Sequence, residues 1–284
     1  MTTRPARIVD AHVHLWDPAH TDWYPYLAGQ MDIGMDNVKG MARAFDVATY
    51  HSEAAGWNVE KLVNVAAATG RHSLAETMEM ERRAEADALI GGLWPTDTVA
   101  ESIAGIEQQM AASRFRGVRP MGAHDGPLPA PDVLRALQER DLVFEILARP
   151  DQLAAAASGL AGHEDLVVVV EHVGWPRSTA DDERALWQAG MDALAAAGPN
   201  VHCKLSGLAM PVGSMDAAAF APWLEPVIER FGVDRCFFAS NFPVDGLHGT
   251  LDELWSAYAA VTTALDDGSR DRLFATNAER VYRI

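Results

Sequence analysis

The fold of this chain is decided near its start, where residues 8–16 read Ile8-Val9-Asp10-Ala11-His12-Val13-His14-Leu15-Trp16. This stretch predicts a short apolar strand that ends in two histidines one residue apart. Successive strand side chains alternate between faces, so we expect His12, His14 and Asp10 to share one face. Two imidazoles at one strand end can hold a metal ion or hydrogen-bond one substrate oxygen. Local packing explains a lone His-x-His pair equally well, so the other strand ends decide between the two.

Apolar runs and helical patterns alternate along the rest of the chain. This alternation favours a parallel sheet, and eight repeats favour a closed (β/α)8 TIM barrel of the α/β class. No linker or low-complexity tract divides the sequence, so we expect residues 1–284 to form a single domain. After the first strand we expect strands at 62–68, 89–94, 115–120, 142–147, 166–171, 201–205 and 235–240, and helices at 41–56, 73–88, 100–113, 131–140, 151–159, 182–197, 217–231, 251–265 and 270–282.

Two local patterns add to this framework. Ser73 followed three residues later by Glu76 predicts a capping box at the start of the helix 73–88. The loop after Trp16 is rich in aromatic residues and contains prolines that prevent a regular helix. Its rings predict either a wall over a pocket or a loop pinned to the surface.

Composition restricts the class of protein. The 284 residues carry a net charge of −17 and are 49% hydrophobic, which argues against nucleic acid or an anionic membrane as partner but does not indicate the substrate. The only cysteines, Cys203 and Cys236, form no disulfide framework, so a cytoplasmic protein is expected. No signal-peptide core or membrane-spanning run is present in the sequence. Homo-oligomerisation is left open.

Polar residues follow the apolar strands at the end where a barrel of this kind places its chemistry. A cluster of buried polar groups costs free energy unless the groups are paired, so such a cluster usually has a function. The residues concerned are His12 and His14 after the first strand, Arg119 after the fourth, Glu145 on the fifth, Glu171 and His172 after the sixth, Lys204 on the seventh, and Asn241 and Asp245 after the eighth.

The order of these motifs resembles the amidohydrolase-related branch of the amidohydrolase superfamily. The motifs are Asp-Ala-His-x-His, Gly-Val-Arg, His-x-Gly-x-Pro, Lys-Leu-Ser-Gly and the final Asn-Ala-x-Arg-x-Tyr, and they extend over nearly the whole chain. Within this branch the chain is most similar to the sugar lactonases and to 2-pyrone-4,6-dicarboxylate lactonase. The resemblance implies a (β/α)8 barrel that opens a lactone by water attack on its carbonyl carbon.

The resemblance also implies roles for single residues. His12, His14 and His172 match the family's histidines, Arg119 matches the arginine that binds a substrate carboxylate or hydroxyl group, and Lys204 matches the lysine of the seventh strand. Asn241 departs from the pattern, because the family usually has an aspartate there that binds metal or activates water. An amide is a poor base and a weak metal ligand.

The resemblance leaves the metal content open between none and one divalent ion. Two-metal members use a carboxylated lysine near the fourth strand, and no lysine lies there in this chain. A single Zn²⁺ could use His12, His14, His172 or Glu145, although replacement of the aspartate by Asn241 lowers the affinity. The pyrone-dicarboxylate lactonases are thought to work without metal. We therefore expect a metal-independent or weakly metal-binding site.

Lactone hydrolysis needs an activated water and stabilisation of the charge on the carbonyl oxygen. We expect His12 and His14, with Lys204, to stabilise the oxyanion, and His172 to act as the base, with Asp245 as the second candidate for that role. For contact with the substrate we expect a set of four residues. These are Arg119, Lys204, Asn241 and Trp16.

Structural roles are the alternative for several of these residues. His172 could be a core histidine, Lys204 could pair with Glu145 or Glu171, and Asp245 before glycine could serve a turn. Two other functions also remain open. One is a metal-dependent decarboxylase of the same superfamily, against which Asn241 counts. The other is a barrel repurposed to bind a small molecule.

Overall fold

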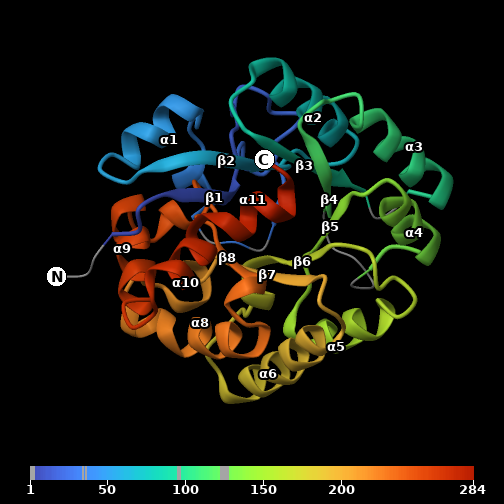
Figure 1. Cartoon of the computed structure of the whole chain (residues 1–284). Coiled ribbons are helices and arrows are strands. Elements are labelled where there is room, and N and C mark those ends of the chain that lie inside the picture. The colour runs from blue at the N-terminus through green and yellow to red at the C-terminus, as the bar shows by residue number, and fades with distance from the viewer. Residues whose placement is uncertain (1–3, 34, 36, 95–96, 122–127) are drawn as a thin grey trace.

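A computed structural model of the chain describes residues 4–33, 35, 37–94, 97–121 and 128–284. Its eight strands form one parallel sheet in the order of the sequence, β1 to β8. Figure 1 shows the helices as a ring around these strands, so the predicted (β/α)8 barrel is confirmed. The strands are β1 Ile8–Val13, β2 Val59–Val65, β3 Ala88–Leu93, β4 Phe115–Pro120, β5 Val143–Ile146, β6 Val168–Val170, β7 Val201–Leu205 and β8 Cys236–Phe238.

The barrel closes between its first and last strands just beyond the end of β8. A parallel bridge joins Val13 to Phe242. The Asn241 amide donates to the His12 carbonyl oxygen at 2.8 Å, and the His14 amide donates to the Phe242 carbonyl oxygen at 2.9 Å. Residues far apart in the sequence therefore meet at one seam.

A helix follows each strand as expected, but the helix predicted at 41–56 is shorter, Val47–Glu53, and the one predicted at 73–88 ends at Arg83. Helix α8 begins and ends where the sequence predicts, and a four-residue helix after β7 was not predicted. The helices are α1 Val47–Glu53, α2 His72–Arg83, α3 Val99–Gln109, α4 Pro131–Glu139, α5 Pro150–Gly159, α6 Asp181–Ala196, α7 Ala209–Val212, α8 Ala217–Phe231, α9 Leu251–Val261, α10 Asp267–Asp271 and α11 Asn277–Tyr282, with a π-helical turn at Arg272–Thr276 between the last two.

Helix α11 lies across the middle of the barrel in Figure 1. Its Val281 and Tyr282 pack with Val9 and Ala11 of β1 in a core cluster that also includes residues of β2, β3, β5, β6 and β8. An ion pair holds α11 to the first half of β2, where Lys61 pairs with Glu279 at 2.7 Å. The C-terminal helix thus plugs the end of the barrel at which the strands begin.

Two expectations about local structure are wrong. The pairing register of β1 with β2 shifts between Asp10 and Val13, so simple alternation fails there. Asp10 consequently accepts a hydrogen bond from Tyr50 of α1 at 2.7 Å and does not lie with the histidines. Helix α2 has no side-chain cap, because Ser73 Oγ donates to the Gly70 carbonyl oxygen and Glu76 turns inward.

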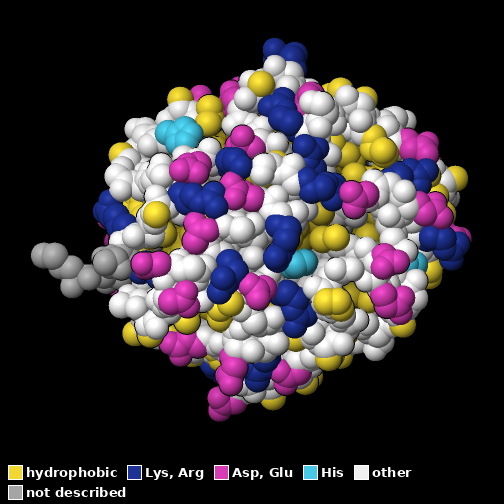
Figure 2. All heavy atoms as spheres, viewed as in Figure 1, with side chains coloured by type: hydrophobic (Ala, Val, Ile, Leu, Met, Phe, Trp, Pro, Cys, Tyr) yellow, Lys and Arg dark blue, Asp and Glu magenta, His cyan; other side chains and the backbone are white. Residues whose placement is uncertain are grey.

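Three further observations concern the cysteines, the helices and the surface. Cys203 and Cys236 are both buried and free. Within the described ranges, no helix is both long and apolar enough to span a bilayer. On the face seen in Figure 2, acidic and basic side chains are interspersed over the surface.

Candidate active site

His12 and His14 face one another at the barrel seam. Their Nε2 atoms lie 3.2 Å apart, and His14 Nδ1 lies 2.8 Å from the carbonyl oxygen of Val65. Burial, followed by the charge of Arg119, lowers the pKa of His14 to about 3. Burial, followed by the charge of Lys204, lowers the pKa of His12 well below its usual value. Both imidazoles are therefore neutral at pH 7.

The neighbours of this pair determine which nitrogen carries each proton. The Val65 carbonyl oxygen only accepts, so His14 carries its proton on Nδ1 and offers a lone pair on Nε2. His12 must then donate from Nε2, which leaves its Nδ1 as an acceptor. Lys204 Nζ, which only donates, lies 3.4 Å from that Nδ1. His12 is thus the proton donor of the pair.

Lys204 lies inside the barrel against a carboxylate. Its Nζ donates to Glu145 Oε2 at 2.7 Å, and the hydroxyl of Tyr282 donates to Glu145 Oε1 at 2.6 Å. All three side chains are fully buried. Glu145 is therefore occupied by Lys204 and Tyr282, and Lys204 combines a salt bridge with a contact to His12.

His172 lies on a sharp corner after β6. It and Val173 have φ values of 51° and 55°, in the left-handed region that is unfavourable for residues with a side chain. The corner turns the His172 ring inward, where its Nδ1 lies 3.0 Å from Ser206 Oγ and its centroid 4.6 Å from that of His12. Backbone strain at functional sites often serves to aim a side chain in this way.

Glu171, the residue before His172, contacts several of the other polar groups. Its carboxylate oxygens lie 3.6 Å from Arg119 Nη1, 3.7 Å from His12 Nδ1 and 3.8 Å from His172 Nε2. Neither oxygen accepts a hydrogen bond within the described part of the chain, and neither do Arg119 Nε and Nη1 donate one. Burial raises the pKa of Glu171 to about 8.

Asn241 and Asp245 form a pair behind His14. Asn241 also has a left-handed backbone, with φ of 57°, and its Nδ2 donates to Asp245 Oδ1 at 2.8 Å. The other oxygen, Asp245 Oδ2, is buried and has no hydrogen-bond partner among the described residues. Burial raises the pKa of Asp245 to about 7. Asn241 thus separates this carboxyl group from the imidazoles.

Aromatic rings make one wall beside the histidines. The Trp16 indole stacks parallel to the His14 ring, with centroids 5.7 Å apart, and its Nε1 donates to the Arg43 carbonyl oxygen. Tyr24 and Tyr26 pack around Trp16 with centroid distances of 6.1 Å and 6.3 Å. All three rings are buried, and Trp16 lies beside the His14 ring, so the aromatic residues hold this part of the loop next to the histidines.

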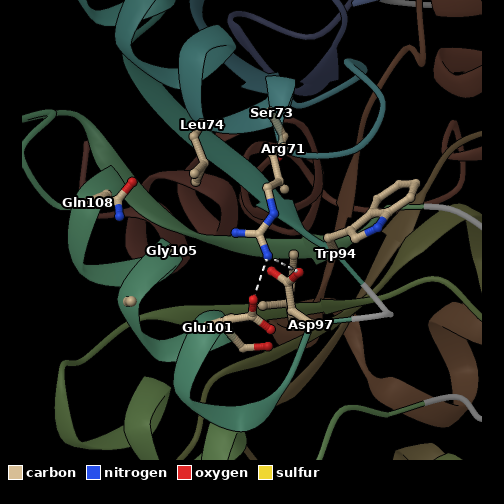
Figure 3. Close-up of a pocket in the computed structure, with 12 residues that line it drawn as sticks. Arg71, Ser73, Leu74, Trp94, Asp97, Glu101, Gly105 and Gln108 are labelled. Atoms are coloured by element: carbon tan, nitrogen blue, oxygen red, sulfur yellow. Dashed lines mark hydrogen bonds and ion pairs between the residues drawn. The ribbon is translucent and has the colours of Figure 1, made fainter.

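A separate cavity of about 110 Å³ lies between α2, α3 and the end of β3. In Figure 3, the Arg71 guanidinium points across this cavity towards Asp97 and Glu101, and Trp94 flanks it. None of the histidines, acidic residues or basic residues described above in this section lines it. The histidine cluster therefore lies outside this cavity.

The predicted residues are thus gathered at one end of the barrel, with one addition. His12, His14, His172, Lys204 and Arg119 are linked by short contacts either directly or through Glu171. Glu171 was counted among the polar residues at the strand ends, but no catalytic, binding or metal-binding role was predicted for it. The signal was available, because it directly follows the valine run of β6, but its inward direction depends on the corner that a sequence does not reveal.

Only one group of histidine, cysteine or acidic side chains with metal-ligand spacing occurs within the described ranges. It consists of His12, Glu171 and His172, whose ligand atoms lie within 4.8 Å of one another. Two imidazoles and a carboxylate are ligands that Zn²⁺ takes, and the unpartnered oxygens of Glu171 are free to bind. The residues therefore fit a single divalent metal in kind and spacing, with Lys204 and Arg119 as opposing charges beside it.

Comparison with known proteins finds relatives that span nearly the whole chain. An uncharacterised protein of Sinorhizobium fredii is 28% identical over 98% of both chains. An L-fucono-1,5-lactonase of Burkholderia ambifaria is 28% identical over 97% of this chain and 95% of its own. Among solved structures, an amidohydrolase of Burkholderia multivorans with bound zinc has a TM-score of 0.79 at 24% identity and covers 98% of this chain and 100% of its own.

The family comparison extends over almost the whole molecule. The amidohydrolase family model matches residues 9–284, which include all the strands except the first residue of β1, and every polar group of the cluster. The chain therefore belongs to the amidohydrolase family, as the order of its motifs predicted.

Proposed function

We propose that this protein is a lactonase that opens a sugar lactone or a carboxylated lactone by water attack on the carbonyl carbon. The observation that carries the proposal is the buried cluster in which a proton-donating imidazole, a second imidazole and a carboxylate meet. Its relatives named L-fucono-1,5-lactonase support a sugar lactone as the first candidate.

His12 stabilises the carbonyl oxygen in this proposal. Its Nε2 proton now points at His14, and a substrate oxygen that enters the site takes the place of the His14 lone pair. Lys204 behind Nδ1 strengthens His12 as a donor, because a positive charge there stabilises the electron density that moves into the ring. Negative charge that develops on the oxygen is thus met by a buried hydrogen bond.

His172 accepts the proton of the attacking water. Ser206 orients its ring, and Glu171, with a pKa raised to about 8, lies 3.8 Å from Nε2, where its ionised form stabilises the imidazolium that forms. The water oxygen bonds to the carbonyl carbon, the ring carbon–oxygen bond breaks, and the ring oxygen takes the proton from His172. Asp245 is the second candidate base, acting from behind Asn241.

Four residues are proposed to contact the substrate. Arg119, with unpaired N–H groups beside the cluster, binds a hydroxyl or carboxylate group of the substrate. Trp16, which stacks on His14, contacts one face of the lactone ring. Lys204 and Asn241 are the other two side chains proposed to contact the substrate.

A single Zn²⁺ would be held by His12, Glu171 and His172, and when bound it would polarise the substrate carbonyl group. Lys204 and Arg119 lower the affinity of this position for a cation, since both lie within 3.6 Å of its ligands. The carboxylated lysine of two-metal members has no counterpart, because Lys39, Lys61 and Lys204 are the only lysines and Lys204 is paired with Glu145.

The proposal is tested with a panel of sugar 1,5- and 1,4-lactones and carboxylated lactones in weak buffer with a pH indicator. Lactone opening releases a proton, whereas binding alone does not. Metal content is measured on protein purified without added ions, and carbon dioxide release from aromatic carboxylic acids is followed in parallel. Proton release supports a lactonase, and carbon dioxide release without it contradicts the proposal.

The base is tested by His172→Ala and Asp245→Ala, made separately. We expect His172→Ala to lower kcat at least about 100-fold, the usual contribution of a general base, and Asp245→Ala to lower it less. If neither change slows the reaction, the assignment of the base is wrong.

A further inference from the structure

We propose that Tyr282, which enters from the plugged end of the barrel, is a positioning residue for the reaction. It holds Glu145, Glu145 holds Lys204, and Lys204 determines which nitrogen of His12 carries the proton. This inference rests on the proposed function for its effect on catalysis, but its first step concerns the free protein alone.

The line of contacts is continuous and buried. The Tyr282 hydroxyl is 2.6 Å from Glu145 Oε1, Glu145 Oε2 is 2.7 Å from Lys204 Nζ, and Lys204 Nζ is 3.4 Å from His12 Nδ1. Tyr282, Glu145, Lys204 and His12 are each 0% exposed. None of the four side chains is therefore in contact with bulk solvent.

The Tyr282 hydroxyl completes the surroundings of Glu145. Each carboxylate oxygen accepts one hydrogen bond, one from Tyr282 and one from Lys204. Removal of the hydroxyl deprives the buried Oε1 of its hydrogen bond from Tyr282, which is unfavourable for a charged group. Glu145 then turns to share Lys204 between both oxygens, and Nζ moves away from His12.

Lys204 is the fixed donor at one end of the two-histidine chain. While it donates to His12 Nδ1, the His12 proton must lie on Nε2, towards the side where the substrate carbonyl group is proposed to bind. If Nζ withdraws, His12 can instead carry its proton on Nδ1, facing Glu171 Oε1 at 3.7 Å. His12 then has no proton to offer the substrate.

The fold fixes Tyr282 from the opposite side. Arg116 Nε donates to the Tyr282 carbonyl oxygen at 2.8 Å, and the Tyr282 ring packs 5.8 Å from that of Phe237. The ring also lies 5.5 Å from Lys204 Nζ. The helix that plugs the barrel is therefore part of the catalytic framework as well as a closure.

The test compares Tyr282→Phe with Val281→Ala. Both alter α11 in the same core cluster, but only the first removes the hydroxyl. Protein labelled with ¹⁵N-histidine is studied by long-range proton–nitrogen correlation, with the His12 signals identified by their loss in His12→Gln. We expect the His12 nitrogen shifts to move from the Nε2–H form in Tyr282→Phe and to stay in place in Val281→Ala.

Kinetics and stability complete the experiment. Once a lactone substrate is found, kcat of Tyr282→Phe should fall about tenfold or more, with KM changed less than about twofold, while Val281→Ala at a similar Tm keeps its kcat. Unchanged His12 shifts in Tyr282→Phe, or shifts that move while kcat matches that of Val281→Ala, overturn the proposal. Glu145→Gln replaces Tyr282→Phe if that variant does not fold, and the same His12 shift is expected.

The absence of any lactone substrate would count against the proposed function. The nitrogen shifts would still decide whether Tyr282 controls His12.

Discussion

Glu171 shows how one side chain can connect a site. Its carboxylate lies within 3.8 Å of Arg119, His12 and His172, and its oxygens accept no hydrogen bond within the described residues. Buried carboxylates are normally fully paired, so an unpaired one beside two imidazoles is typical of a functional group.

Glu171→Gln tests this role with a change of charge and little change of shape. We expect kcat/KM to fall at least about tenfold, because an amide cannot stabilise the His172 imidazolium. Zinc affinity, measured by titration calorimetry, should also fall. Glu164→Gln, on the surface, is the control and should alter neither quantity. Wild-type activity in Glu171→Gln would exclude a catalytic role for this carboxylate.

Prediction from sequence succeeded for residues whose direction follows from strand ends. Arg119 and Lys204 lie on regular strands and His14 directly follows β1, so their place at one end of the barrel follows from the strand order, whereas His12 lies in the irregular part of β1. Asp10 failed because a register shift in β1 breaks the alternation, and nothing in the local sequence announces that shift.

At the scale of elements, the corner after β6 places His172, and the loop after β7 makes room for it. Gly207 has φ of +68°, and a Cβ atom there would lie 2.6 Å from His172 Cγ and 2.7 Å from its Nδ1. A side chain at this position must therefore displace the imidazole.

Gly207→Ala should lower both stability and activity. We expect a loss of about 1–3 kcal/mol in the free energy of unfolding, and a fall in kcat from the displaced ring. Gly213→Ala is a matched control, because φ is +69° there and nothing lies within 4 Å of the added Cβ. It should lose stability by backbone strain alone and keep its kcat. Equal kcat losses in the two variants would refute the argument.

Glu76 links helix α2 to the loop after β2 and was predicted to cap the helix. It instead accepts hydrogen bonds from the amides of Ala67 and Ala68 and from the Tyr24 hydroxyl. A capping box and an inward-facing glutamate have the same sequence spacing, so the sequence could not separate them. Burial raises the pKa of Glu76 to about 7, from an ordinary value of 4.5.

This shift predicts a pH dependence of stability. A raised pKa in the folded state means that the contribution is complete below about pH 4.5 and is lost as pH rises through about 7. The free energy of unfolding should fall by about 3 kcal/mol over that window from this group. Denaturant titrations of the wild type and Glu76→Gln should show that component only in the wild type. The hydrogen bond from Arg82 lowers the pKa of Glu79, so Glu79→Gln should remove a component of stability that rises with pH.

The whole molecule is closed by contacts between distant parts of the chain. Arg7 pairs with Asp271 at 3.0 Å and Glu279 at 2.9 Å, and donates to Thr276 at 2.9 Å. This network fastens the C-terminal segment to the start of β1. The sequence predicted eight repeats and hence the barrel, but not this network, because contacts over more than 260 positions leave no local pattern.

Arg7→Ala should lower the free energy of unfolding by about 1–2 kcal/mol, and less at high salt, because three polar contacts are lost at a half-buried position. Thermal unfolding at two salt concentrations measures both effects. Arg135→Ala, which breaks an exposed pair with Asp132, should change stability by less than about 0.5 kcal/mol. A similar change in the two variants would contradict a closing role for Arg7.

The seam between β1 and β8 has a consequence for the protein's synthesis. His12 leaves the ribosome long before Asn241, yet the Asn241 amide donates to the His12 carbonyl oxygen across that seam. In a growing polypeptide the histidine cluster therefore lacks its seam with β8 until residues 240–242 have been translated and have docked. The enzyme is therefore inactive during most of its translation and can become active only when most of the chain has been synthesised.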